Sequence, residues 1–238
     1  MITIPKTQPP PVLYKYYPPE RLDVLEDLEV HFSSPSKFND AFDTYHMLPG
    51  TADLKNKIGR SKLRNEIGVL CLTERPDNHM MWVNYARNHT GFVIGFASGS
   101  PFFESGGRQL RKVLYQKSPP IFDEANENGC FYKAPEWIYE EEWRCIRRFT
   151  QDERRTVSIE WSMVKQIIFG HQIAQSMISR IVYIATAWSN FEGIPLPLFF
   201  SSTPSHSSWS FRNRKQHFEM CDKCNGDGYV NTGAAKDN

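Results

Sequence analysis

The alternation of apolar and polar positions predicts a chain of short strands with few long helices. Residues 68–73 and 91–96 form two apolar runs of the length expected for buried strands. Between them, a Pro-Asp-Asn break precedes large apolar side chains at helical spacing, namely Met81, Trp82, Tyr85 and Ala86. Residues 68–96 therefore predict a strand–turn–helix–strand unit, which is either a packing unit or one wall of a site.

The N-terminal part predicts an aromatic strand at residues 12–17, then a helix opened by Pro18 and Pro19. A strand at residues 29–33 leads into the turn-rich loop SSPSKFNDAFD, which Phe38 and Phe42 are expected to anchor to the core. Such an anchored loop can grip a ligand, or its polar side chains can cap its own backbone.

A charged segment, WIYEEEWR, predicts a strand that begins at Trp137. Period-two alternation places Glu140, Glu142 and Arg144 on one face of that strand. These groups form either a site in which the two carboxylates titrate apart, or a surface ion-pair ladder. We further expect a helix in residues 51–66, a strand at 112–116, core strands near 156–160 and 164–170, and a helix at 172–182.

The pattern predicts a mixed α+β fold with a split two-sheet core, flanking helices and a short C-terminal tail. The expected organisation is a Pro-rich leader (1–11), a single domain (12–200), a Ser-rich basic linker (201–216), and a tail (217–238). The tail contains Cys221-x-x-Cys224, whose spacing lets two thiolates meet one zinc ion, with His217 as a third ligand. The alternative is a reduced, disordered tail without metal.

Composition, net charge and cysteine count limit the classes of function that the chain can have. The 238 residues are 40% hydrophobic and 13% aromatic, which indicates a globular body. A net charge of +1 gives no whole-chain argument for nucleic acid or an anionic membrane. The chain lacks an apolar run of the roughly 20 residues that span a bilayer. Five cysteines, an odd number, fit a reducing compartment, so we expect a cytoplasmic protein without a membrane partner.

Several motifs resemble known families. The runs LYKYY, FSSPSKFNDAFD, GVLCLTERPDNHMMWVNYARNHTGFVIGF and WIYEEEWR follow the order typical of the bacterial domain-of-unknown-function family numbered 2971, over residues 12–170. The run CDKCNGDG resembles one copy of the zinc-binding repeat of J-type co-chaperones, which use two copies for each zinc. The order of elements also resembles the split-sheet ADP-ribosyltransferases, particularly toxins that modify nucleic acid.

The last resemblance implies an NAD-dependent transferase that acts as a toxin or phage-defence effector, with a neutralising partner protein and a nucleic-acid or protein acceptor. In that family a strand-borne glutamate stabilises the ribosyl transition state, a role that falls here to Glu142, with Glu140 as alternate. Arg144 would contact pyrophosphate or neutralise Glu142, and Trp82 or Tyr85 would stack on nicotinamide or pack in the core. The remaining NAD contacts implied are Tyr14, Lys15, Ser33, Ser34, Phe38, Asn39 and Asp40.

Two other functions stay open. A non-catalytic nucleotide or nucleic-acid binding module would use the basic residues Arg147, Arg148, Arg212, Arg214 and Lys215 beside exposed aromatic residues. A metal-dependent nuclease would use Asp40, Asp43, Glu140 and Glu142. The chain has no Gly-x-Ser-x-Gly run and no Walker or Rossmann glycine loop, which argues against hydrolases and nucleotide-binding enzymes of those types.

Overall fold

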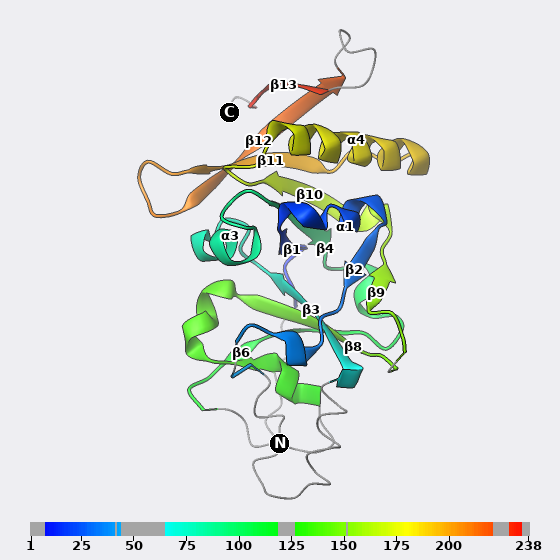
Figure 1. Ribbon diagram of the computed structural model, residues 1–238, viewed down its shortest axis with the longest axis vertical. Coiled ribbons are helices and arrows are strands. Elements are labelled where there is room, and N and C mark those ends of the chain that lie inside the picture. The colour runs from blue at the N-terminus through cyan, green and yellow to red at the C-terminus, as the bar shows by residue number, and fades with distance from the viewer. Residues whose placement is uncertain are drawn as a thin grey trace, which may run out of the picture. The chain divides into compact units, whose positions relative to one another are not determined.

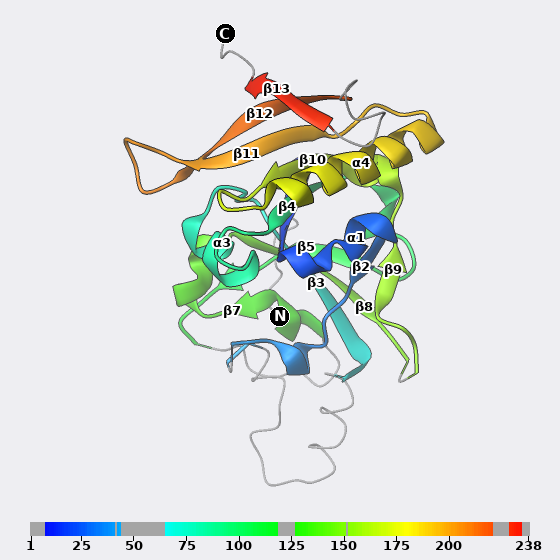
Figure 2. The same ribbon diagram turned by 45° about the horizontal axis from the view of Figure 1, so that its top comes forward.

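The computed structural model describes residues 8–40, 42–43, 65–118, 127–150, 152–220 and 229–234 (Figures 1 and 2). The chain divides into two compact units. Unit 1 comprises Met1–Pro11, Val30–Glu74 and Ser98–Val157. Unit 2 comprises Val12–Glu29, Arg75–Ala97 and Ser158–Asn238. Each unit is therefore assembled from segments that are distant in sequence.

Unit 1 is built on three consecutive antiparallel strands in the order β3-β8-β5, namely β3 (Ile67–Thr73), β8 (Glu142–Arg148) and β5 (Gln109–Lys112). A second, parallel pair joins β6 (Leu114–Tyr115) to β7 (Tyr132–Lys133), and β2 (Glu29–His31) pairs with β9 (Thr156–Ser158). Short 3-10 helices connect these strands: η2 (Pro35–Lys37), η4 (Pro101–Phe103), η5 (Glu127–Phe131) and η6 (Pro135–Glu140).

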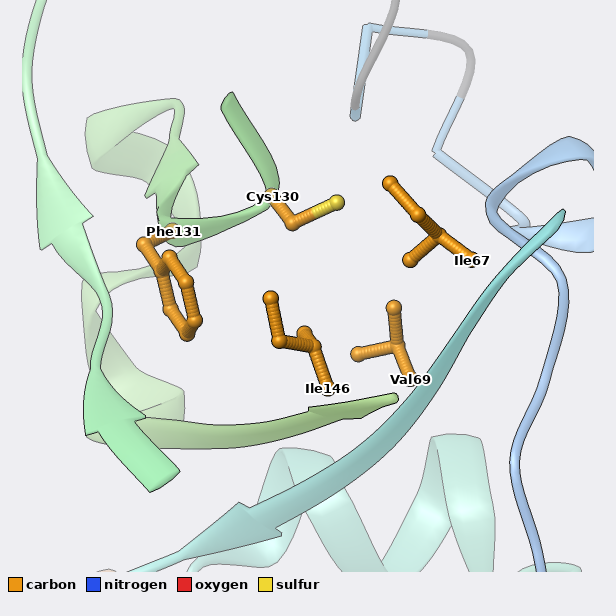
Figure 3. Packing of buried hydrophobic residues seen from close by; sticks show 5 residues of the cluster. All are labelled: Ile67, Val69, Cys130, Phe131 and Ile146. Atoms are coloured by element: carbon orange, nitrogen blue, oxygen red, sulfur yellow. The ribbon is translucent and has the colours of Figure 1, made fainter. Parts of the chain in front are cut away.

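One face of β3 and β8 packs against η5. Ile67 and Val69 of β3 and Ile146 of β8 form a buried cluster with Cys130 and Phe131 (Figure 3). The sequence predicted the apolar run of β3, but the partner residues come from a segment with no apolar periodicity. This cluster fixes η5 and β7 beside β8, which places their polar groups next to the strand's first residues.

Unit 2 contains six strands in the order β13-β12-β11-β10-β4-β1. Only β10 and β11 run parallel; the other neighbours are antiparallel. The strands are β1 (Val12–Tyr17), β4 (Phe92–Ala97), β10 (Val164–Phe169), β11 (Leu198–Pro204), β12 (Phe211–Met220) and β13 (Tyr229–Ala234). The helices are η1 (Pro19–Arg21), α1 (Asp23–Glu26), α3 (His79–Tyr85), η7 (Trp161–Met163) and α4 (Gln175–Glu192), and α4 runs alongside β10 and β11 in both views (Figures 1 and 2).

The predicted strand–turn–helix–strand unit is confirmed as β3, α3 and β4. Asn78 caps α3, because its side-chain oxygen accepts a hydrogen bond from the Met81 backbone N–H at 3.2 Å. The Trp82 ring is fully buried and meets Tyr16 edge-on at a centroid distance of 5.1 Å. The helix therefore packs on β1 within unit 2.

The α+β class is confirmed, while several boundaries differ. The expected helix at 172–182 begins later and extends to Glu192, where Gly193 ends it in a left-handed conformation. The expected linker at 201–216 is wrong, since β11 and β12 pair there as an antiparallel hairpin. The expected strand at 112–116 is divided between β5 and β6. Most of the expected helix at 51–66 lies outside the described residues. No helix in the described ranges is long and apolar enough to cross a bilayer.

Candidate functional site: a buried charged cluster on β8

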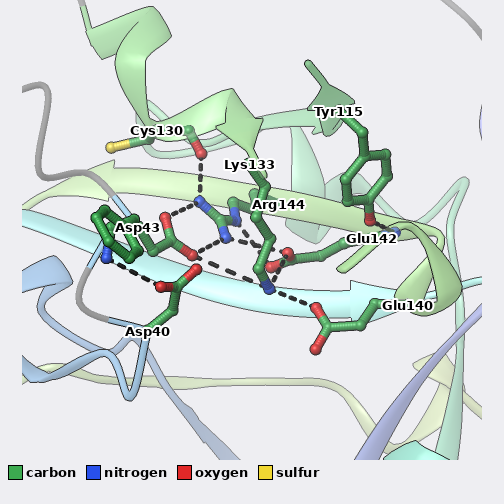
Figure 4. Close-up of polar contacts among 9 residues, drawn as sticks. Asp40, Asp43, Tyr115, Cys130, Lys133, Glu140, Glu142 and Arg144 are labelled. Atoms are coloured by element: carbon green, nitrogen blue, oxygen red, sulfur yellow. Dashed lines mark hydrogen bonds and ion pairs between the residues drawn. The ribbon is translucent and has the colours of Figure 1, made fainter. Parts of the chain in front are cut away.

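Arg144 is the centre of a polar cluster in unit 1 (Figure 4). Its Nε donates to Glu142 Oε1 at 2.8 Å, and its Nη2 donates to Glu142 Oε2 at 3.0 Å. The same guanidinium binds both oxygens of Asp43, at 2.9 and 2.5 Å, and donates to the Cys130 carbonyl at 2.7 Å. The side chain is only 1% exposed. All five N–H groups of the guanidinium are thus used.

Lys133 supplies the second cation of the cluster. Its Nζ lies 2.5 Å from Glu140 Oε2, 3.1 Å from Glu142 Oε2 and 4.0 Å from Asp43 Oδ2. The ammonium group also lies 4.7 Å from the centroid of the Trp137 ring, within range of a cation–π contact. Lys133 therefore links Glu140 and Glu142, which Arg144 alone does not do.

The backbone explains why these side chains converge. Register places Glu142 opposite Thr73 and Arg144 opposite Cys71, so Glu142 and Arg144 share one face of β8. Before the strand, η6 ends at Glu141 in a left-handed conformation (φ 42°). The strand expected from Trp137 is therefore wrong at its start, because β8 begins at Glu142. Glu140 belongs to η6, and the left-handed turn at Glu141 directs the Glu140 carboxylate toward the cluster.

The charges of the cluster determine the protonation states of Glu142, Lys133 and Arg144. Burial opposes ionisation of Glu142, but Arg144 and Lys133 outweigh that effect and lower the pKa of this carboxyl to about 2. Burial likewise disfavours the charged form of Lys133, yet Glu142 and Glu140 raise its pKa above the ordinary value. The pKa of Arg144 is raised for the same reason, by Glu142 and Asp43. Glu142 is therefore a carboxylate at neutral pH.

The loop at residues 33–43 reaches the cluster through Phe38 and Asp43. The Phe38 ring centroid lies 5.3 Å from Arg144 Cζ, and Asp43 forms the bidentate ion pair described above. Phe42, expected as a second anchor, is 77% exposed, so that expectation is wrong. The anchoring group beside Phe38 is instead the charged Asp43.

The other polar residues of this loop mainly bond to nearby groups. Ser33 exchanges backbone hydrogen bonds with Val69 of β3, both 2.9 Å long, and Ser34 pairs its hydroxyl with that of Ser36 at 2.7 Å. Asp40 accepts from the Phe42 N–H at 2.9 Å. Asn39 is exposed. For Asp40, the self-capping alternative describes this contact, whereas Ser33 is fixed by backbone pairing with β3.

The predicted NAD contacts of β1 and α3 lie in unit 2. The Tyr14 hydroxyl donates to Gln166 at 3.1 Å, and Lys15 lies 5.7 Å from the Tyr17 ring centroid. Trp82 has no exposed face on which nicotinamide could stack, which corrects that expectation in favour of core packing. Tyr85 is half-buried at the end of α3.

Lys133 is the site residue that sequence reasoning missed. It lies seven positions before Glu140 in an irregular segment, so no periodicity marks it. Tyr115, whose hydroxyl accepts from the Glu142 N–H at 2.9 Å, was missed for the same reason. The only available signal was a lone lysine beside an acidic run, which more often indicates a solvated surface.

The nuclease alternative receives little support from this geometry. Oxygens of Asp43, Glu140 and Glu142 already accept from Lys133 or Arg144, so they do not form an open set of metal ligands. The described part of the chain contains no group of three or more His, Cys, Asp or Glu residues arranged to hold a metal ion. Cys221 and Cys224 lie outside the described residues, while His217 is exposed on β12.

Comparison with protein families identifies one match. Residues 81–145 match the family described as "Protein of unknown function (DUF2971)". That match supports the family expected from the motifs. The matched segment begins in α3 and ends in β8, so it includes Lys133, Glu140, Glu142 and Arg144. Neither a curated protein nor a solved structure matches the chain.

Proposed function

We propose that this protein is an NAD-dependent ADP-ribosyltransferase-like enzyme in which Glu142 stabilises the ribosyl transition state. The supporting observation is the convergence, in one buried cluster, of the strand-opening glutamate and the loop that the resemblance associates with NAD. Asp43 of that loop and Glu142 share the guanidinium of Arg144, across about a hundred residues of sequence.

The chemistry suits an ionised carboxylate. In the proposed reaction the bond between nicotinamide and ribose breaks, an acceptor oxygen or nitrogen bonds to the same ribose carbon, and the acceptor proton passes to solvent. Positive charge develops on the ribose, and a fixed negative charge stabilises it. The low pKa of Glu142 keeps that charge present throughout the neutral range. Glu140, linked to Glu142 through Lys133, is the second carboxylate and orients the acceptor.

Arg144 has a different role from a pyrophosphate contact. Since all five of its N–H groups are used within the protein, we assign it as a positioning residue that holds Glu142 and the loop. The side chains of Glu142 and Glu140 are 4% and 3% exposed, so NAD reaches them through a local opening of the cluster. The proposal therefore includes a conformational step on NAD binding.

The direct test incubates the full chain with adenylate-labelled NAD and total cell extract. We expect label transfer or NAD loss with the natural protein, and a reduction of about 100- to 1,000-fold in Glu142→Gln. Glu136→Gln, an exposed glutamate in the same segment, is the matched control and should retain activity. Circular dichroism establishes that Glu142→Gln is folded at the assay temperature.

The measurements that would overturn the proposal are made on the natural protein alone and do not depend on any variant. If it neither consumes NAD nor transfers label, and calorimetry shows no NAD binding, the proposal is overturned. For an effector that arrests cells, expression of the natural chain should stop growth, while Glu142→Gln at equal abundance should not. Growth arrest that persists with Glu142→Gln would argue against a transferase as its cause.

A further inference from the structure

The hairpin of β11 and β12, expected from sequence to be a linker, presents an unusual surface. Its tip is ordered by its own hydrogen bonds: the Ser205 N–H donates to the Ser210 carbonyl at 2.9 Å, and the hydroxyls of Ser208 and Ser210 lie 2.7 Å apart. Trp209 nevertheless has its whole side chain in solvent, with a relative exposure of 104%. An organised turn thus presents a large aromatic ring to solvent, where it is accessible to a flat ligand group.

The hairpin is also uniformly basic. Residues 193–218 contain no aspartate or glutamate, but they include Arg212, Arg214 and Lys215. All three side chains are exposed. Arg212 donates to the Ser207 hydroxyl at 3.0 Å, and within the described residues none of the three cations forms an ion pair with a carboxylate. This concentration of positive charge contrasts with the near-neutral chain and suits a polyanion.

Further aromatic rings lie at the base of the hairpin. The Phe211 ring is stacked on His89 at a centroid distance of 4.7 Å, and on the exposed His79 at 6.0 Å with planes only 13° apart. His89 is itself stacked on the buried Trp82. The half-buried Phe211 and exposed His79 are therefore held in nearly parallel planes by rings beneath them, which is a preformed platform for flat groups.

We propose that this hairpin surface, defined as Trp209, Phe211, His79, Arg212, Arg214 and Lys215, binds single-stranded nucleic acid. Bases stack on the aromatic rings, and phosphates bind the three cations. A single strand fits better than a duplex, because only unpaired bases offer their faces to an exposed tryptophan. By contrast, Arg147 of the earlier basic set is paired with Glu153 at 2.5 Å, so its charge is already compensated. The proposal does not depend on the transferase activity.

Fluorescence anisotropy with labelled RNA and DNA single strands of about 12 nucleotides tests the proposal, with the annealed duplex as comparison. If three phosphates are neutralised, affinity should fall about 20-fold between roughly 50 and 200 mM salt. Trp209→Ala should weaken binding by about 5- to 160-fold, which corresponds to the loss of one stacked base. Phe191→Ala removes an 82% exposed aromatic side chain from α4, and it should leave the affinity unchanged.

The contribution of the basic side chains to binding is tested with a second variant and a control that removes the same charge. The double variant Arg212→Ala/Arg214→Ala should reduce the logarithmic salt slope from about −2 to about −0.7. Lys165→Ala/Arg180→Ala removes the same charge from exposed positions elsewhere in unit 2 and should leave the slope unchanged. All these substitutions are at exposed positions, so thermal unfolding should confirm intact folds.

Three outcomes would overturn the proposal. The first is no binding of any single strand at low salt. The second is binding that neither Trp209→Ala nor the double arginine variant changes. The third is binding to vesicles of anionic phospholipid without binding to oligonucleotides, because an exposed tryptophan beside arginines also suits a lipid surface.

Discussion

At the scale of single residues, Arg144 determines the character of the β8 cluster. Its guanidinium is the shared partner of Asp43 and Glu142. The ammonium group of Lys133 cannot replace it, because only a planar guanidinium offers paired N–H groups to a carboxylate. A buried arginine of this kind is not in itself a source of net stability, because desolvation offsets much of the attraction. Its removal, however, leaves buried carboxylates with too little opposing charge.

Replacing Arg144 by methionine should therefore lower the free energy of unfolding by about 3–5 kcal/mol, as measured by urea denaturation. Arg180→Met removes an arginine that is exposed and paired with Glu26 on the surface, and it should change stability by less than about 1 kcal/mol. Equal effects of the two substitutions would contradict the importance of the buried cluster.

The pKa of Glu142 gives an expected pH dependence of stability. Its folded-state value of about 2 lies below the ordinary 4.5, so the ionised form favours folding. This contribution is fully present above about pH 4.5 and is lost as the pH falls toward 2. Denaturation followed from pH 6 downward should show a loss of a few kcal/mol across this window. Glu142→Gln should show a smaller loss, and an identical acid limb would contradict the assignment.

At the scale of elements, the turn between α3 and β4 shows how close backbone contacts fix local geometry. Arg87, Asn88 and His89 have positive φ values of 45°, 52° and 67°. A β-carbon built on Gly91 would lie 2.0 Å from the Tyr17 carbonyl oxygen, and one on Gly170 would lie 2.2 Å from that of His89. The backbone of the turn thus lies in direct contact with the end of β1 and with the residue after β10, and only glycine fits at Gly91 and Gly170.

Gly91→Ala should accordingly reduce the free energy of unfolding by about 3 kcal/mol or more, since backbone would have to move. Gly99→Ala is the matched control, because no atom lies within 4 Å of its added β-carbon. It should be neutral to within about 0.5 kcal/mol. Thermal and urea denaturation of both variants would measure the difference, and a neutral Gly91→Ala would show that the turn relaxes freely.

Element prediction from the sequence succeeded where a short run of residues is almost continuously apolar. The runs that became β3, β4 and β10 each have the composition of buried strands. It failed at residues 137–141, where WIYEE has strand-like alternation but forms η6 after Pro135. It failed again at residues 201–216, where Ser, Pro and Arg gave no strand signal although the hairpin is paired. In the first case a proline at the start of η6 favours a helical turn, and in the second strand pairing overrides a weak local preference.

At the scale of the whole molecule, the two proposed activities belong to different units. Glu142→Gln should abolish NAD turnover and leave oligonucleotide affinity unchanged, because the hairpin surface is built entirely in unit 2. Trp209→Ala should weaken oligonucleotide binding and leave the loss of NAD in the absence of an acceptor unchanged. Measuring both quantities on both variants separates the proposals; a variant that removes both activities would indicate one shared site.

The zinc expectation belongs to the tail of the molecule and remains a prediction from sequence. Elemental analysis of purified protein should find bound zinc that Cys221→Ser and Cys224→Ser each remove, since two thiolates are the minimum contribution of this motif. His217→Ala should weaken zinc retention without abolishing it. Absence of zinc from protein prepared in its presence would favour a reduced tail.

The sequence by itself determined the α+β class, the strand–turn–helix–strand unit, and the shared face of Glu142 and Arg144. These follow from local periodicity and composition, which a single sequence displays directly. Only the tertiary structure decided that Asp43 and Lys133 complete the charged cluster, that Trp82 packs in the core, and that the supposed linker is a hairpin. These features depend on pairing between segments far apart in the chain, and such pairing leaves no periodic trace in the sequence around each residue.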